Sequence, residues 1–285
     1  MNLFDKLTLE ALRNQPQLNS LRVVVEKELL HHDILRVLSE NNLLKDLVFI
    51  GGTCLRCCYG GARLSEDLDF TGGRNFSKDS LLQMGNILVD NLYAKYALPI
   101  VVSDPIKEGQ NVSTWKIRVE TRPQSKHLPA QRINIDICAL PSYEKRPMML
   151  INPYGVDMGT SGLIIQAQSR EEIYADKLLA FAFRPNRIKY RDLWDIIWLH
   201  ELGLKPRLEL IPEKLKDRNY SVEDFISAFT ERQSILVDNK DIGKEFIWEM
   251  QRFLPESKMK QVAQNENLLP FMAHLLEDIL NQVNA

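Results

Sequence analysis

Hydrophobic residues recur at helical spacing at the start of the chain and then form short runs. Between Leu21 and Leu38 the apolar positions fall mostly three or four residues apart, which predicts that the first 45 residues are helical. The apolar run Leu47–Ile50 ends at Gly51-Gly52, a pattern typical of a buried strand entering a tight turn. Residues 53–60 are expected to form a helix behind that turn.

Two later segments, residues 113–121 and 132–140, alternate apolar and polar residues and are predicted to be strands. A helix is predicted before them, over residues 78–97. Isoleucines of the second strand would face a core, and its polar face would carry Asn134, Asp136 and Cys138. Prolines then mark a loop region at Pro141, Pro147 and Pro153.

After residue 168 the helical spacing continues to the end of the chain. Ser169 and Glu172 have the spacing of a capping box and open a helix predicted over residues 171–183. A second helix is predicted over residues 189–202, and the remainder is helical with turns at prolines. The chain is therefore expected to change from mixed α/β structure to helices.

These elements predict an α+β fold in two domains. Residues 1–165 would form a mixed α/β domain with N-terminal helices, and residues 166–285 an all-helical domain that completes the active-site cleft. No apolar run is long enough to span a membrane, and the N-terminus lacks the core of a signal peptide, so a cytoplasmic protein is expected. The net charge of -2 argues against an extended basic surface but leaves room for a local basic groove.

The cysteines favour a reducing compartment over a disulfide framework, because three of the four lie within five residues, at Cys54, Cys57 and Cys58. The fourth is Cys138. No second CxxC pair or HxxxH follows, so small buried core residues are favoured over a zinc site, and a redox pair is the weaker alternative.

The segment with the clearest chemistry is residues 50–70. Within the predicted strand 65–70, Asp67 and Asp69 share one face, where two carboxylates repel unless a cation lies between them. Magnesium accepts such oxygen ligands together with substrate phosphates. Gly51-Gly52 allows backbone amides to approach a phosphate, and Thr53 adds a hydroxyl. This combination is typical of nucleotidyl transfer from a nucleoside triphosphate.

Further charged residues each have more than one interpretation. Asp136 is a general base, a ligand in a two-metal clamp, or a solvent-facing acid. Lys177 lies among apolar residues of its helix and, from pattern alone, favours a surface lysine over a phosphate-binding charge. Arg191, Asp192 and Asp195 are helix neighbours that form either a salt-bridged surface or, with Lys189, a basic patch for phosphates.

Four motifs together resemble the AbiEii/MenT family of nucleotidyltransferase toxins, over about residues 48–200. They are GGTCLRCCYGGARLSEDLDF (51–70), INIDI (133–137), YADKLLAF (174–181) and KYRDLWDI (189–196). The resemblance implies a polymerase-β-like nucleotidyltransferase core. Where the superfamily often has Gly-Ser, this chain has Gly-Gly-Thr, and Thr53 is expected to supply the hydroxyl.

The resemblance also implies roles for single residues. Asp67 and Asp69 match the metal-binding acids, and Ser65 matches an active-site serine that is phosphorylated by the antitoxin in some relatives. Lys177 matches the lysine that contacts the nucleotide. Asp192 matches the distal acid that supports catalysis, and Asp195 is a weaker match to that role.

The function expected from these observations is Mg²⁺- or Mn²⁺-dependent transfer of a nucleotide from a nucleoside triphosphate to RNA, such as tRNA. The resemblance implies the toxin of a toxin–antitoxin or abortive-infection (phage defence) system, with an AbiEi-type antitoxin as partner. The alternatives are an antibiotic-type enzyme acting on a small molecule, and a catalytically idle nucleotide- or partner-binding module. Basic residues near the motifs would hold RNA phosphates: Arg56, Arg63, Arg187, Lys189 and Arg191.

Overall fold

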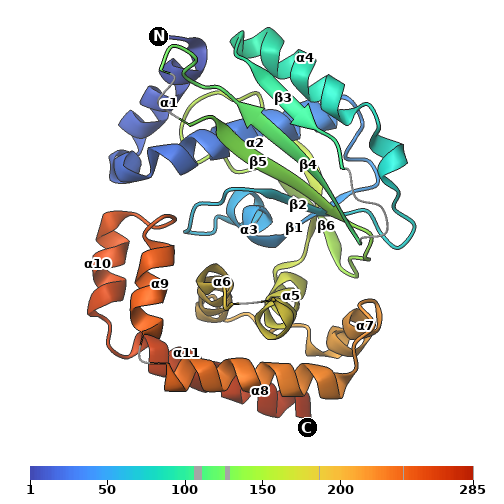
Figure 1. Cartoon of the computed structure of the whole chain (residues 1–285), viewed down its shortest axis with the longest axis vertical. Coiled ribbons are helices and arrows are strands. Elements are labelled where there is room, and N and C mark those ends of the chain that lie inside the picture. The colour runs from blue at the N-terminus through green and yellow to red at the C-terminus, as the bar shows by residue number, and fades with distance from the viewer. Residues whose placement is uncertain (106–110, 126–128, 186, 240, 285) are drawn as a thin grey trace. The chain divides into compact units, whose positions relative to one another are not determined.

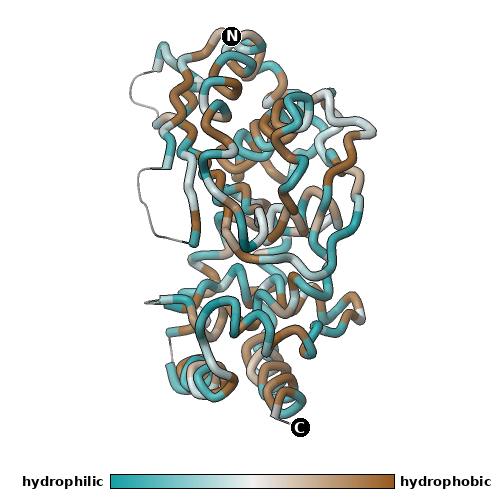
Figure 2. Tube along the Cα trace, turned by 90° about the vertical axis from the view of Figure 1, so that its right-hand side faces the viewer, coloured by the Kyte–Doolittle hydropathy of each residue, from teal (hydrophilic) through white to brown (hydrophobic). Residues whose placement is uncertain are grey.

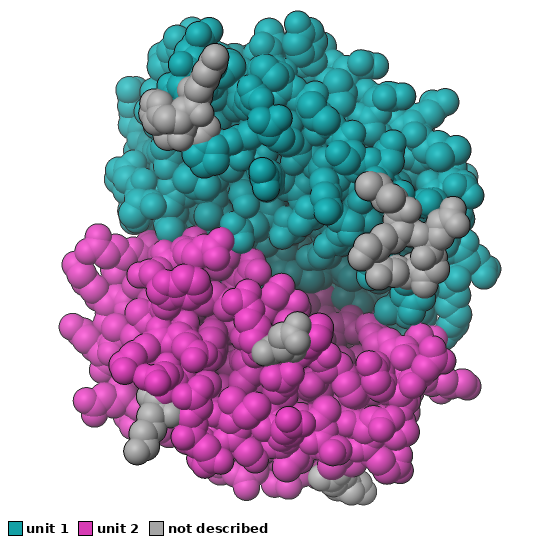
Figure 3. Space-filling view, in the orientation of Figure 1, with its two compact units in different colours: residues 1–168 teal, residues 169–285 magenta. Residues whose placement is uncertain are grey.

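The computed structural model describes residues 1–105, 111–125, 129–185, 187–239 and 241–284. It divides into two compact units, Met1–Gln168 and Ser169–Ala285, which Figure 3 shows in separate colours. The predicted division after residue 165 lies three residues before the observed one. The predicted α+β fold class is confirmed, since a mixed sheet forms the centre of unit 1 and helices make up unit 2.

In the described part of unit 1, a seven-stranded sheet has the order β3-β4-β5-β2-β1-β7-β6 (Figure 1). Strand β2 is parallel to β5 and β1 is parallel to β7, whereas the other neighbours are antiparallel. The strands are β1 (Val48–Ile50), β2 (Leu68–Thr71), β3 (Ile100–Ser103), β4 (Val112–Val119), β5 (Gln131–Cys138), β6 (Lys145–Met149) and β7 (Ile164–Gln168).

Helices α2 and α4 pack against each other and against β5 and β3. The side chains that β4 and β5 bury are those predicted from the alternation, among them Trp115, Ile133 and Ile135. Hydrophobic and polar stretches alternate along the elements of both units (Figure 2). The helices of unit 1 are α1 (Leu3–Asn14), η1 (Pro16–Leu21), α2 (Arg22–Glu40), α3 (Gly51–Tyr59), η2 (Lys78–Leu81) and α4 (Met84–Tyr96).

Several predicted boundaries were wrong. The strand expected from residue 65 begins only at Leu68, so Ser65 and Asp67 lie in the segment that leads into it. Strands β3, β6 and β7 were not predicted. Strand β6 includes Pro147, which has no amide hydrogen to donate, and this is tolerated because β6 is an edge strand of the sheet.

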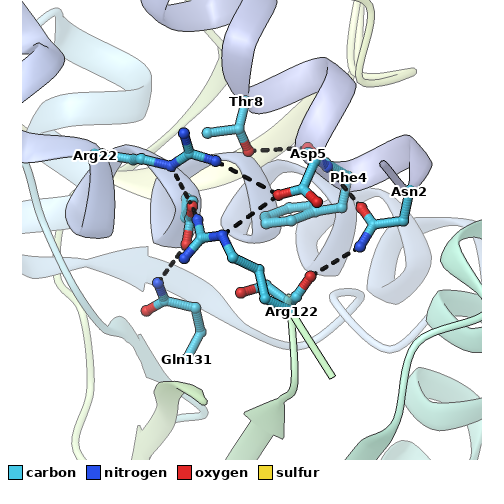
Figure 4. Close-up of polar contacts among 9 residues, drawn as sticks. Asn2, Phe4, Asp5, Thr8, Arg22, Arg122 and Gln131 are labelled. Carbon is cyan, nitrogen blue, oxygen red and sulfur yellow. Dashed lines mark hydrogen bonds and ion pairs between the residues drawn. The ribbon is translucent and has the colours of Figure 1, made fainter. Parts of the chain in front are cut away.

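A polar network ties the N-terminal helices to the sheet (Figure 4). Glu26 of α2 is fully buried and accepts hydrogen bonds from Arg22, Arg122 and Gln131. Both arginines also pair with Asp5 of α1, at 3.5 Å in each case. Because a buried carboxylate is stable only when it is paired and hydrogen-bonded, this network fixes where α1 and α2 lie on the sheet.

Unit 2 begins at the predicted helix cap, where Ser169 Oγ accepts a hydrogen bond from the Glu172 backbone N at 3.1 Å. Helix α5 packs against α6 and α8, with the rings of Phe181 and Phe229 in an edge contact. The helices are α5 (Arg170–Phe183), α6 (Tyr190–Glu201), η3 (Leu208–Leu210), α7 (Ile211–Lys216), α8 (Val222–Asp238), α9 (Ile242–Met250), α10 (Glu256–Gln264) and α11 (Leu268–Asn284).

The cysteines are free, and Cys54, Cys57 and Cys58 are buried in α3. Burial raises the pKa of the Cys54 and Cys57 thiols, which makes them poor nucleophiles and metal ligands at neutral pH. This supports the interpretation as core residues. No helix in the described ranges is long and apolar enough to cross a membrane.

Candidate active site

The turn between β1 and α3 is shaped by two glycines that lie directly against charged side chains. Gly51 has a φ of +74°, and a Cβ added there would lie 2.9 Å from Asp69 Oδ2. A Cβ on Gly52 would lie 2.1 Å from a terminal nitrogen of the Arg63 guanidinium. The absence of side chains therefore lets a carboxylate and a guanidinium approach the backbone at the start of α3.

Three carboxylates gather where β2 pairs with β5. Asp69 and Asp136 are register partners on the two parallel strands, on the face opposite Leu68 and its buried neighbours. Asp67 reaches the same strand, since its Oδ1 accepts a hydrogen bond from the Asn134 backbone N at 3.0 Å. Neighbouring strands are about 4.8 Å apart, so these acids repel one another unless a cation lies among them.

The acids fit a divalent cation that is shared with a substrate. The described residues contain no group of three or more His, Cys, Asp or Glu side chains arranged to enclose a metal. Mg²⁺ needs no such cage, because it binds through one or two carboxylates and completes its coordination with phosphate and water. Asp67 and Asp69 would be the residues to hold it, with hard oxygen ligands, and Asp69 lies against the Gly51-Gly52 turn, where backbone amides suit a phosphate.

Thr53 and Ser65 contact each other, and Thr53 contacts the backbone of the acidic segment. Both are buried, and their hydroxyl oxygens are 2.6 Å apart. Thr53 donates its hydrogen to the Asp67 carbonyl oxygen, so Ser65 must donate to Thr53. The strand expected from residue 65 would have put Ser65 on one face with Asp67, but Ser65 lies before β2 and is buried. In the structure, the Thr53 hydroxyl holds the backbone of Asp67, and the Ser65 hydroxyl holds Thr53.

Helix α2 holds the segment that precedes Asp67. The Glu28 carboxylate accepts a hydrogen bond from the Ser65 backbone N at 2.8 Å, and Lys27 pairs with Glu66 at 2.9 Å. His31 Nε2 lies 3.0 Å from the Glu66 carbonyl oxygen, which can only accept, so this nitrogen carries the proton. Burial lowers the pKa of His31 to about 3, and the ring is therefore neutral at pH 7.

Two arginines expected to contact RNA are occupied inside unit 1. Arg56 pairs with Glu28 at 3.1 Å and donates to the Gly61 carbonyl oxygen at 3.0 Å. Arg63 is buried and donates to the Leu64 carbonyl oxygen at 3.1 Å. Their interpretation as surface contacts for nucleic acid is therefore corrected: both hold the α3 region in place.

Unit 2 brings a second group of predicted residues together. Lys177 of α5 is buried, and its Nζ lies 2.6 Å from Asp192 Oδ1 and 2.8 Å from Asp195 Oδ2 on α6. Arg184 pairs with the other oxygen of Asp192 at 2.9 Å. The reading of Lys177 as a surface lysine was wrong, because its ammonium group joins two buried carboxylates.

Arg191 of α6 makes contacts to α9 and to the residues after it. The Arg191 guanidinium lies 3.5 Å from Glu249 and 4.6 Å from the centre of the Phe253 ring. Lys189 is half-buried at the N-cap of α6, and Arg187 is exposed. Of these three residues, only Arg187 is exposed, and Lys189 and Arg191 are half-buried.

The residues that position the acids were not predicted from the sequence. Glu28 gives no signal, because it lies 37 residues from the Ser65 backbone that it binds. Thr114, which donates to Asp136 Oδ1 at 2.6 Å, comes from another strand. Asn134 was recognisable in part, since it lies two residues before Asp136 on the same face of β5.

Comparisons with solved structures return proteins of low sequence identity. JHP933 from Helicobacter pylori is 18% identical, with a TM-score of 0.47, covering 91% of this chain and 94% of that one. A second H. pylori protein, assigned as a nucleotidyltransferase, is 19% identical, with a TM-score of 0.46, covering 89% of this chain and 96% of that one. No curated protein sequence matches the chain.

A family model described as "Nucleotidyl transferase AbiEii toxin, Type IV TA system" matches residues 33–277. This range includes the turn, the acids of unit 1 and the ion-paired cluster of unit 2. It also extends well past the motifs that carried the resemblance. The chain therefore belongs to the AbiEii family of nucleotidyltransferases, the toxins of type IV toxin–antitoxin systems.

Proposed function

We propose that this nucleotidyltransferase moves a nucleotide from a nucleoside triphosphate to a hydroxyl of an RNA acceptor such as tRNA, with Mg²⁺ held by Asp67 and Asp69. The observation that carries the proposal is the meeting of Asp67, Asp69 and Asp136 on one face of the sheet, with Asp69 directly against Gly51. Their carboxylates are oxygen ligands of the kind that Mg²⁺ accepts together with substrate phosphates.

In the proposed reaction, the acceptor oxygen attacks the α-phosphorus of the triphosphate. The bond from that phosphorus to the bridging oxygen of the β-phosphate breaks, and pyrophosphate leaves. Asp136 takes the proton of the attacking hydroxyl, or else serves as a further metal ligand. When bound, the metal supplies positive charge to the phosphate oxygens in the transition state. Thr53 and Glu28 keep Asp67 in position through the backbone contacts described above.

The family implies an antitoxin as partner, and we propose that it is of the AbiEi type and that the system limits phage growth. A toxin that adds nucleotides to tRNA would halt translation by blocking the acceptor end. We also propose that Lys177 contacts the nucleotide, the role that the resemblance of its motif implies.

The test uses the full chain with each radiolabelled nucleoside triphosphate, Mg²⁺ and total tRNA. Wild-type protein should label tRNA with at least one nucleotide, and EDTA should abolish the label. Asp69→Asn should abolish transfer without lowering thermal stability, because it removes one of the repelling carboxylates. Asp90→Asn, on an exposed position of α4, is the matched control and should leave transfer unchanged.

Full activity of Asp69→Asn would contradict the assignment of the metal ligands, and so would undiminished activity of the wild-type protein in excess EDTA. Absence of tRNA labelling with all four nucleotides, together with labelling of a small hydroxyl-bearing acceptor, would favour the antibiotic-type alternative.

A further inference from the structure

The face of the sheet that carries the acids also carries a row of basic side chains. Lys116 and Arg118 of β4 and Arg132 of β5 are exposed, while their strand neighbours Trp115 and Ile133 are buried on the other face. Because side chains alternate along a strand, the even-numbered residues of β5 share one face. Arg132 is thus on the same face as Asp136, four residues away, or about 13 Å along the strand.

The pairing of β4 with β5 fixes the order of this row. Thr114 is opposite Asp136, Lys116 is opposite Asn134, and Arg118 is opposite Arg132. Moving along the strands from Asp136, the face therefore changes from acidic, through a polar position, to basic. We call Lys116, Arg118 and Arg132 the basic row.

The basic row lowers the stability of the sheet. Like charges directly opposite on neighbouring strands are destabilising, and Arg118 and Arg132 are such a pair. Arg118 has one recorded partner, Glu120, at 2.8 Å. Within the described ranges, the structure records no ion pair or side-chain hydrogen bond for Lys116 or Arg132. A bound polyanion would remove the repulsion.

We propose that the basic row binds the phosphate backbone of the acceptor RNA and leads its reacting end to the acids. This inference rests on the proposed function and adds the surface that holds the acceptor. The positive charge of the basic row suits a chain of phosphates. Arg132 of the row lies on the same face of β5 as Asp136, so a strand bound along the row would lead to that acid. The proposed function places the triphosphate at the Gly51-Gly52 turn, which leaves the row for the second substrate.

The test is a binding titration of fluorescently labelled tRNA with the full chain, without nucleotide, across a range of salt concentrations. Arg118→Gln/Arg132→Gln should weaken RNA binding about tenfold at physiological salt. It should also reduce the slope of log K against log[salt] by roughly 1.4, because two phosphate contacts to a single strand are lost. Arg118→Lys/Arg132→Lys should retain most of the affinity.

The matched control is Lys6→Gln/Arg13→Gln, which removes two exposed positive charges from α1 in the same unit. It should change RNA affinity little. Equal RNA binding by the two glutamine variants would overturn the proposal, as would a wild-type protein that does not bind tRNA. A parallel loss of nucleoside triphosphate affinity in the β4–β5 variant would also overturn it, by assigning the row to the nucleotide.

The titration needs no turnover, so it separates this inference from the proposed function. Salt-dependent tRNA binding that requires the basic row supports the inference even where no label is transferred, and then the reaction alone would be reassigned. Selective binding of an acidic protein, with no binding of RNA, would make the row a protein interface and contradict the inference.

Discussion

Replacing Lys177 with Met tests whether the ion-paired cluster of unit 2 holds that unit together. The side chains of Lys177, Asp192 and Asp195 are only 11%, 7% and 4% exposed. Met keeps the length and apolar stem of the lysine but removes its charge. The two aspartates would then lose a shared partner that lies within 2.8 Å of each.

The expected cost follows from the burial of the acids. Removing one partner of a buried ion pair destabilises a protein by about 3 to 5 kcal/mol. We expect the lower end of that range, about 3 kcal/mol, because Arg184 still pairs with Asp192. At an m-value of about 2 kcal/mol per molar urea, the unfolding midpoint should fall by roughly 1.5 M.

Urea unfolding followed by tryptophan fluorescence suits this question, since Trp194, Trp198 and Trp248 lie in unit 2 and only Trp115 in unit 1. Adding Asp195→Asn to Lys177→Met should recover part of the loss, because an amide replaces the carboxylate that lost its partner.

Lys260→Met is the control for this prediction. Lys260 pairs with Glu256 on the exposed face of α10, and its side chain is 70% exposed. The midpoint should not move for this variant. An unchanged midpoint for Lys177→Met would refute the reasoning, and a simultaneous loss of nucleotide binding by the folded variant would show that the lysine also serves the substrate.

Two further predictions concern unit 1. Gly51→Ala and Gly60→Ala should each lower the free energy of unfolding by about 1 kcal/mol, because both glycines have a φ of +74°. Only Gly51→Ala should also impair transfer, since its Cβ would displace Asp69. The free energy of unfolding should fall as the pH drops from 6.5 toward 4. Burial lowers the pKa of His31 to about 3 and that of His32 to about 4, so in this range only the unfolded chain protonates its histidines. At pH 5.5 the loss should be about 1.4 kcal/mol per histidine in urea unfolding, and His32→Gln should halve the pH dependence.

The sequence predicted well those elements whose periodicity extends over many residues. Helices α5 and α6 and the strands β4 and β5 were recognisable because each buries one face along its whole length. Strand β3 is only four residues long, and β6 has mainly exposed residues and a proline, so neither gives a clear alternation. Edge strands such as these are stabilised by their neighbour in the sheet, which a local pattern does not contain.

In the candidate site, too, residues that form a local pattern were predicted, and residues whose partners are distant in the chain were not. Asp67, Asp69 and Asp136 were identifiable because closely spaced acids on alternating strands are visible in the sequence itself. Partners distant in the chain were not. Arg56 looks like a surface residue until Glu28, on another helix, is seen to pair with it. Lys177 looks like a surface lysine until its two aspartates are placed beside it, 15 and 18 residues later.

Like charges face each other twice on one side of the sheet of unit 1. Asp69 faces Asp136 across β2 and β5, and Arg118 faces Arg132 across β4 and β5. Exchanging one residue between the pairs would give two attractive contacts, so stability alone would favour mixing the signs. The separated arrangement instead suits a ligand that carries a cation at one end and phosphates along its length. A metal-bound nucleotide meeting an RNA strand has that charge distribution, so both pairs agree with the proposal that they are the two ends of one substrate-binding face.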